Sequence, residues 1–148
     1  MFVPAGFDPP LGLATDRFRL EPLGTQHNER DYAAWSSSIE HILGSAGYGP
    51  DGSWPHEMSL DDNRRDLERH AADFVARTGF TYTVLDADDE VAGCVYVYPA
   101  RDEEHDAHVQ SWVRASRAEL DAPLRQVVAA WLAKDWPFER PLYVPLLG

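Results

Sequence analysis

The sequence predicts one α/β domain in which β-rich runs and helical stripes share a single core. Three β-rich runs, over residues 80–85, 91–98 and 107–113, are separated only by short acidic turns, which is the pattern of adjacent strands in a meander. On both sides of this meander, over residues 28–43 and 120–132, apolar residues recur at three- and four-residue steps, as along the buried stripe of a helix. With 148 residues, of which 44% are apolar, the chain is long enough to bury this core as one domain.

The N-terminal part of the chain predicts an arm, a strand and a helical region. Residues 1–14 are rich in proline and glycine and predict an extended arm, laid over the surface or against a neighbouring molecule; the domain itself is then expected over residues 15–148. Apolar and polar residues alternate over residues 18–23, which predicts a half-buried strand, and Pro22 favours a place near the sheet edge. Residues 28–43 then predict a helix or a pair of helices.

The central part predicts a loop followed by a capped helix. Glycines and prolines punctuate residues 45–57, so we expect a loop that is anchored by the aromatic side chains of Tyr48 and Trp54. Ser59 offers a hydroxyl that can accept a hydrogen bond from a free backbone amide, which predicts the start of a helix. Gly79 is expected to end this helix, because glycine adopts the left-handed backbone conformation without a steric penalty.

The C-terminal part predicts one more helix and one more strand. The clearest helical stripe of the chain includes Pro123 in its first turn and stops before Pro137, which cannot continue a helix. Residues 141–144 are apolar and β-rich and predict a last strand. The expected order is therefore strand, helical region, three-stranded meander, helix and strand, with no internal repeat and no second domain.

The charge balance narrows the classes of partner. The formal net charge is −12, with 25 acidic side chains against 13 lysines and arginines. The resulting field repels phosphate backbones and anionic lipid headgroups, so we expect neither nucleic acid nor a membrane surface as a partner. The same field favours a cationic ligand such as an amine, although an acidic surface also serves solubility alone.

Cysteine usage and the N-terminal residues point to the cytoplasm. The single cysteine, Cys94, excludes an intrachain disulfide, and its apolar neighbours over residues 93–98 predict a buried thiol and not a nucleophile. Residues 1–13 lack the positively charged leader of a signal peptide. No apolar run reaches the ~18 residues that cross a bilayer, so we expect a cytoplasmic protein.

Several segments resemble the GNAT (N-acetyltransferase) superfamily. Residues 15–23, Thr-Asp-Arg-Phe-Arg-Leu-Glu-Pro-Leu, resemble the "Thr-x-Arg-Leu-x-Leu-Arg-Pro-Leu" opening of the branch with ribosomal-protein and antibiotic N-acetyltransferases. Residues 80–84 and 91–96 are similar to the second and third strands of that family, and residues 112–114 to the exit of its fourth strand. Over residues 15–144 the resemblance implies a GNAT-like α/β (α+β) fold with a mixed, mostly antiparallel central sheet flanked by helices.

The chain departs from the family pattern at two places. The family usually has Gln/Arg-x-x-Gly-x-Gly/Ala after the fourth strand, where backbone amides at a helix N-terminus hold the pyrophosphate of CoA. Residues 114–121 contain no glycine, so we expect Arg114 and Arg117 to contact the phosphates directly through their guanidinium groups. After the strand at 141–144 the family continues with another helix and two strands, so the chain resembles a C-terminally shortened member.

The resemblance implies the parts of a site for acetyl transfer from acetyl-CoA to a small amine or a peptide amine. In the family the fourth strand diverges from the fifth, and its free backbone groups bind the pantetheine arm and the thioester carbonyl. That role falls here on Ser111, Trp112 and Val113. Candidates for the base are Glu21 and, on the fourth strand, His108 or Gln110; we prefer His108, because its intrinsic pKa is near neutral.

The loop of residues 45–57 supplies the expected acceptor pocket, since the family's loop between the first two helices borders that pocket. Tyr48 and Trp54 are expected to shape it. The alternating carboxylates and histidines of residues 103–108 do not have the spacing of a metal site, so we expect none. A non-catalytic GNAT-like module that binds another ligand or forms a homodimer remains the alternative to an enzyme.

Overall fold

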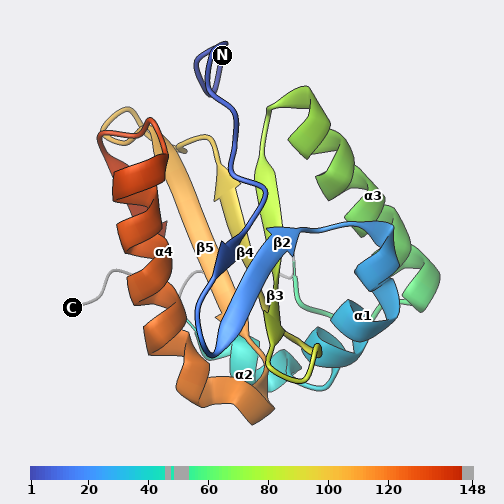
Figure 1. Ribbon diagram of the computed structural model, residues 1–148. Helices are drawn as coiled ribbons and strands as arrows, with labels where there is room; N and C mark the ends of the chain where they lie inside the picture. Colours follow the sequence, from blue (N-terminus) through green and yellow to red (C-terminus); the bar gives the residue numbers. More distant parts are fainter. Residues whose placement is uncertain (46–47, 49–53, 145–148) are drawn as a thin grey trace.

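The structure is a computed structural model that describes residues 1–45, 48 and 54–144 (Figure 1). Within these residues the chain forms one six-stranded sheet whose strands follow their sequence order from edge to edge. The strands are β1 (Leu13–Ala14), β2 (Phe18–Pro22), β3 (Phe80–Asp86), β4 (Val91–Tyr98), β5 (Ala107–Val113) and β6 (Pro141–Val144); the helices are α1 (Asn28–Ser36), α2 (Ile39–Leu43), α3 (Leu60–Ala76) and α4 (Asp121–Asp135), with short 3₁₀ helices η1 (Thr25–His27) and η2 (Ala115–Leu120).

The pairing of the strands confirms the expected mixed, mostly antiparallel sheet. Strands β1 to β5 pair antiparallel with their neighbours, so β3, β4 and β5 form the predicted meander. Only β6 runs parallel to its neighbour, and its four residues pair with residues 107–110 of β5. A parallel neighbour requires a crossover connection, and α4 provides it between β5 and β6.

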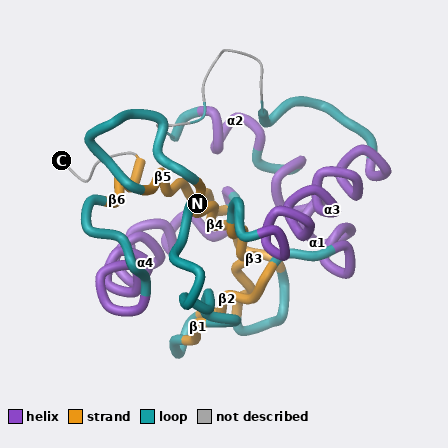
Figure 2. The backbone as a smooth tube through the Cα atoms, turned by 90° about the horizontal axis from the view of Figure 1, so that it is seen from above, coloured by secondary structure: helices purple, strands orange, loops and turns teal. Residues whose placement is uncertain are grey.

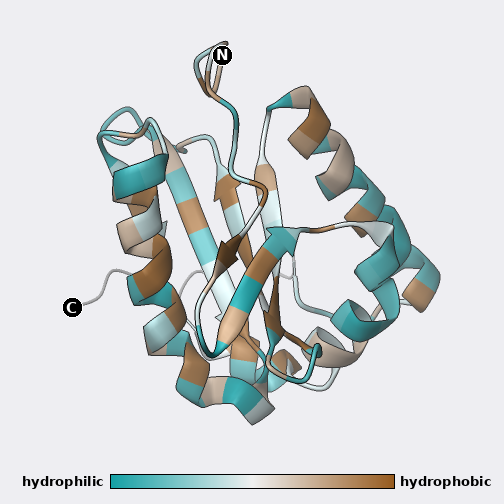
Figure 3. Ribbon diagram, in the orientation of Figure 1, coloured by the Kyte–Doolittle hydropathy of each residue, from teal (hydrophilic) through white to brown (hydrophobic). Residues whose placement is uncertain are grey.

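Helices cover both faces of the sheet (Figures 1 and 2). Helix α4 lies on one face, and α1, α2 and α3 lie on the other. Because side chains alternate along a strand, β4 sends Val95 and Val97 to the α4 side, whereas Cys94 packs with Trp35 of α1 and Leu67 of α3. Almost all residues of β3 and β4 are buried, as expected of a sheet covered on both faces, and in Figure 3 brown segments recur along the strands between white and teal ones.

The N-terminal arm lies against its own domain. Val3 is 1% exposed and belongs to the core on the α4 face. The Arg77 guanidinium donates to the carbonyl oxygens of Pro4 and Phe7, both at 2.7 Å. The Tyr82 hydroxyl donates to the carbonyl of Pro10 at 2.6 Å. These contacts hold the arm in place before it enters β1.

Helix α3 begins as predicted and ends earlier than predicted. The Ser59 hydroxyl accepts a hydrogen bond from the backbone amide of Asp62 at 3.0 Å, which is the expected cap. The predicted stop at Gly79 is wrong, because the left-handed residue that ends the helix is Arg77, with φ 64°. Gly79 instead makes room for a neighbour: a Cβ atom at this position would overlap the aromatic ring of Tyr98. None of the helices within the described residues is long and apolar enough to cross a membrane.

Candidate functional site

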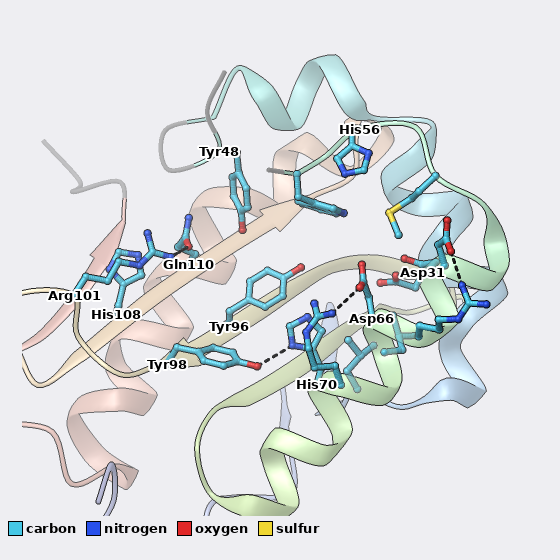
Figure 4. Close-up of a pocket in the computed structure, with 18 residues that line it drawn as sticks. Asp31, Tyr48, His56, Asp66, His70, Tyr96, Tyr98, Arg101, His108 and Gln110 are labelled. Carbon is cyan, nitrogen blue, oxygen red and sulfur yellow. Dashed lines mark hydrogen bonds and ion pairs between the residues drawn. The ribbon is translucent and has the colours of Figure 1, made fainter. Parts of the chain in front are cut away.

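A cavity of about 830 Å³ opens between the sheet and the helices that cover its α1–α3 face (Figure 4). Its floor is built by strand alternation. Tyr96 and Tyr98 of β4 point to the same face, and their cross-strand partners on β5, Gln110 and His108, stand beside them. The walls come from α1, α3 and the loop before α3, so the cavity draws on segments far apart in the sequence.

Asp31 of α1 is the most deeply buried ionisable group in this cavity, with 4% of its surface exposed. Its Oδ2 accepts a hydrogen bond from Nδ2 of Asn63 at 3.1 Å, and the same nitrogen donates to Oδ1 of Asn28 at 2.8 Å. The Trp35 indole in turn donates to Oδ1 of Asn63 at 3.0 Å, which fixes the amide. Burial raises the pKa of Asp31 to about 6, against the opposing effect of the Asn63 hydrogen bond.

His70 of α3 is held by a chain of polar contacts at the cavity wall. Its Nδ1 lies 2.9 Å from the Tyr98 hydroxyl and 3.1 Å from the Thr81 hydroxyl (Figure 4 marks the Tyr98 contact). The Tyr98 hydroxyl donates its one proton to Oδ2 of Asp73 at 2.9 Å, so Nδ1 of His70 is the donor toward Tyr98. Burial lowers the pKa of His70, which keeps the ring neutral with its proton on Nδ1.

The two predicted base candidates lie in different places. His108 lines the cavity, and burial, followed by the positive charge of Arg101, lowers its pKa. Its buried Nε2 has no hydrogen-bond partner within the part of the chain that the structure describes. Glu21 is not among the residues that line the cavity; its Oε1 lies 3.3 Å from Nε2 of His27, on the far side of β3 from β4.

Tyr48 and Trp54 both line the cavity, as the loop was expected to place them. Their rings meet edge to face, with centroids 5.7 Å apart. The Trp54 ring also contacts Trp35 at 5.6 Å and Trp112 at 5.8 Å between centroids. Aromatic side chains therefore close the cavity opposite α3.

The three residues predicted to bind the pantetheine arm occupy the end of β5. The Ser111 hydroxyl bonds the Tyr143 hydroxyl at 2.6 Å on the α4 face, while the Trp112 indole donates to the Tyr96 hydroxyl at 2.9 Å on the cavity face. Val113 is buried in the core on the α4 side. The β6 residues described here pair only with residues 107–110, so β5 continues past the last described residue of its parallel neighbour.

Arg114 directly follows β5 and precedes η2, and Arg117 lies within η2. The Arg114 guanidinium donates to the carbonyl of Val91 at 3.1 Å, while its side chain stays partly exposed. Arg117 pairs with Asp86 at 3.1 Å and with Asp88 at 3.8 Å, and its side chain is 35% exposed. The two arginines stand together before the N-terminus of α4, but Arg117 already has acidic partners from the β3–β4 turn.

Comparison with solved structures identifies the fold of this chain. The ribosomal-protein-S5-alanine acetyltransferase from Vibrio fischeri superposes with a TM-score of 0.68 at 13% identity, over 90% of this chain and 73% of that one. This chain has the GNAT acetyltransferase fold. The ribosomal L7/L12 α-N-protein acetyltransferase RimL in complex with coenzyme A gives a TM-score of 0.63 at 13% identity, over 84% of this chain and 64% of that chain.

A third GNAT structure is the microcin C7 self-immunity acetyltransferase MccE in complex with acetyl-CoA and AMP, with a TM-score of 0.60 and 13% identity over 83% of this chain and 67% of that one. The chain covers less than two thirds of the RimL structures, 61% and 64% of their length. No protein-family model and no curated protein sequence matches the chain. The GNAT fold is therefore visible in the three-dimensional structure and not in overall sequence identity.

Sequence reasoning missed Asp31, Asn63 and His70. A signal for the first two was present: Asp31 stands four residues before Trp35, and Asn63 four residues before Leu67, so each lies on the buried stripe of its helix. A polar residue on a buried stripe is a candidate for a functional or hydrogen-bonded role. Nothing in the sequence indicated that the two stripes face each other.

Proposed function

We propose that the protein is an N-acetyltransferase that transfers acetyl from acetyl-CoA to a small amine or a peptide amine by direct attack. One observation carries the proposal: in a GNAT fold, the cavity reaches β5 at His108 and Gln110, next to the part of the strand that continues past the last described residue of its parallel neighbour. An acceptor in this cavity stands next to the place where the family receives its thioester.

The backbone groups of residues 111–113 are proposed to hold the pantetheine arm and the thioester carbonyl. The lone pair of the acceptor nitrogen attacks that carbonyl, the carbon–sulfur bond breaks, and CoA leaves as the thiolate. A base must take one proton from the nitrogen. His108 suits this role because its lowered pKa leaves an imidazole that can accept a proton at neutral pH.

Arg114 and Arg117 are proposed to bind the phosphates of acetyl-CoA. Both guanidinium groups retain exposed surface at the start of η2. The dipole of α4, which begins after Leu120, also favours an anion near this end of the helix. Arg117 would exchange its bonds to Asp86 and Asp88 for phosphate oxygens, which match the guanidinium in the same way.

Thermal unfolding with and without acetyl-CoA tests the proposed function. A ligand that binds only the native state stabilises it, by about 2.7 kcal/mol at a concentration one hundred times the dissociation constant. We expect the melting temperature to rise in a concentration-dependent way with acetyl-CoA and not with equal amounts of acetate. An unchanged melting temperature at millimolar acetyl-CoA would contradict the assignment.

The acidic partners of Arg117 favour one alternative, a GNAT-like module that binds a ligand in the cavity without catalysis. Asp86 is buried and holds Arg117 at 3.1 Å, so phosphate must compete with a carboxylate for this side chain. In that case a cavity ligand stabilises the protein and acetyl-CoA does not. The same thermal measurement with both kinds of ligand separates the two functions.

A further inference from the structure

Asp31 is a buried carboxylate without a positively charged partner in the described part of the chain. Among those residues its side chain accepts a hydrogen bond from the neutral amide of Asn63, and no lysine or arginine pairs with it. Three of the described arginines line the cavity: Arg65 pairs with Asp61 at 2.7 Å, Arg69 pairs with Asp66 at 2.8 Å, and Arg101 donates to the side-chain oxygen of Gln110 at 3.4 Å. A carboxylate removed from water without a counter-charge is costly, so the cavity is suited to receive a cation.

The surroundings of Asp31 also suit a cation. The Tyr96 ring extends from the sheet floor, and the rings of Tyr48 and Trp54 cover it from the loop (Figure 4 labels the two tyrosines). Aromatic faces attract ammonium groups, and more strongly where water is excluded. The buried Tyr48 hydroxyl has no hydrogen-bond partner among the described residues and lies farther along the cavity, between Tyr96 and Gln110 (Figure 4). A carboxylate, aromatic faces and an unused hydroxyl thus line one space.

A nitrogen held at Asp31 is a poor nucleophile. A neighbouring carboxylate stabilises the charged ammonium, whereas attack on a thioester requires the neutral amine with its lone pair free. At the opposite end of the cavity, a nitrogen can lose a proton and become a nucleophile. Figure 4 shows Asp31 at one end and His108 with Gln110 at the other, on β5. The neutral His108 ring can take a proton there, so a second nitrogen at that end is the one that reacts.

We propose that the acceptor is a small diamine, with one nitrogen held as an ammonium by Asp31 and the other presented to the thioester at the β5 end. The assignment of the second nitrogen rests on the proposed acetyltransferase function; the cation site at Asp31 does not. A cavity of about 830 Å³ is in the size range of pockets that enclose small molecules. The net charge of −12 raises the local concentration of dications around the protein.

The pH dependence of this site follows from the groups that face Asp31. Asp66 of α3 adds negative charge, while Cys94 and Tyr96 of β4 stay neutral because burial raises the pKa of each. His70 of α3 is neutral near pH 7 because its pKa is lowered. Cation binding is therefore present above about pH 6 and is lost as the pH falls through the pKa of Asp31, which is about 6.

Isothermal titration calorimetry with hexamethylenediamine, hexylamine and hexanol tests the cation site in the absence of acetyl-CoA. We expect both amines to bind and hexanol not to bind, because only the amines supply an ammonium for Asp31. The Asp31→Asn variant keeps an acceptor for Asn63 and loses the charge, so we expect amine affinity to fall roughly tenfold or more. Asp135→Asn removes one charge at the exposed end of α4, on the other face of the sheet, and is expected to change affinity less than about twofold.

Acetyl transfer to the same compounds tests whether the second nitrogen of the diamine is the one that reacts. Hexamethylenediamine is expected to be acetylated once, whereas hexylamine binds and inhibits without reacting, because its only nitrogen is held at Asp31. Asp31-dependent amine binding without any transfer would support the cation site and contradict the acetyltransferase function. Equal amine affinity in Asp31→Asn and the native protein, or acetylation of hexylamine as fast as of the diamine, would overturn the proposal.

Discussion

At the scale of the residue, the burial of Asp31 in the cavity lowers the stability of the native protein at neutral pH. Desolvation raises the pKa of this carboxyl from 3.8 to about 6, so the native state binds a proton more tightly than the unfolded chain does. The stability contributed by the protonated form is complete below about pH 4 and is lost as the pH rises from there to about 6. At neutral pH the native protein therefore carries an ionised carboxylate that folding disfavours.

Replacement of Asp31 by Asn should stabilise the protein above pH 6. A shift of about two pKa units corresponds to about 3 kcal/mol, which is the upper limit of the expected gain. Urea unfolding at pH 8 should show Asp31→Asn as the more stable protein, and the difference should shrink toward pH 4.5. A variant that is less stable than the native protein at pH 8 would mean that the carboxylate holds Asn63 in a way that an amide cannot.

At the scale of the element, the junction of α3 and β3 positions the cavity wall. Helix α3 turns out of its axis at the left-handed Arg77, and two residues later Gly79 lies under the Tyr98 ring of β4. The hydroxyl of the same tyrosine lies 2.9 Å from Nδ1 of His70, so the helix end and the strand together set the orientation of the histidine. The position of His70 in the cavity wall therefore depends on close packing at this junction.

Gly79→Ala should therefore destabilise the protein more than an exposed substitution beside it. The added Cβ overlaps the Tyr98 ring, and such overpacking typically costs about 1–3 kcal/mol. Thr78→Ala is the matched control, because Thr78 is exposed, lies beside Gly79 and loses only two long contacts to Asp73, each at 3.4 Å. Thermal unfolding of both variants compares them. Equal melting temperatures would show that the Tyr98 ring moves aside without cost.

At the scale of the whole molecule, two sites of opposite preference lie along β5 and the segment that follows it. The cavity on the α1–α3 face carries the buried Asp31 and suits a cation, whereas Arg114 and Arg117 stand before α4, where an anion is favoured. The cavity reaches β5 at His108 and Gln110, and Arg114 follows the last residue of the strand. This arrangement would bring an amine and an acyl-CoA thioester to the same strand.

The double variant Arg114→Ala with Arg117→Ala tests this separation. We expect it to weaken acetyl-CoA roughly tenfold or more, because two guanidinium–phosphate contacts are removed, and to leave hexamethylenediamine binding unchanged. Calorimetry with each ligand measures the two affinities. The double variant Arg17→Ala with Lys134→Ala, at exposed positions before β2 and near the end of α4, controls for the loss of two positive charges. Undiminished acetyl-CoA affinity in the double variant would reject the proposed phosphate contacts.

Local sequence patterns were sufficient for the secondary structure and for part of the site. The β-rich runs over residues 80–85, 91–98 and 107–113, separated by short acidic turns, were enough to predict the meander, because β-propensity and turn residues are local signals. The Ser59 cap was predictable because it joins residues three positions apart. His108, Tyr48 and Trp54 were expected near the cavity and do line it, although their roles stay predictions.

By itself the sequence determined the order of the elements, the three-stranded meander and the acidic net charge, since each depends on neighbouring residues or on composition. Only the tertiary structure decided that Asp31, Asn63 and Tyr96 share one cavity and that Arg117 pairs with Asp86. These contacts join segments tens of residues apart. The pKa of Asp31 depends on burial, which no local pattern encodes. The chemistry of the site is a property of the packed sheet and its helices.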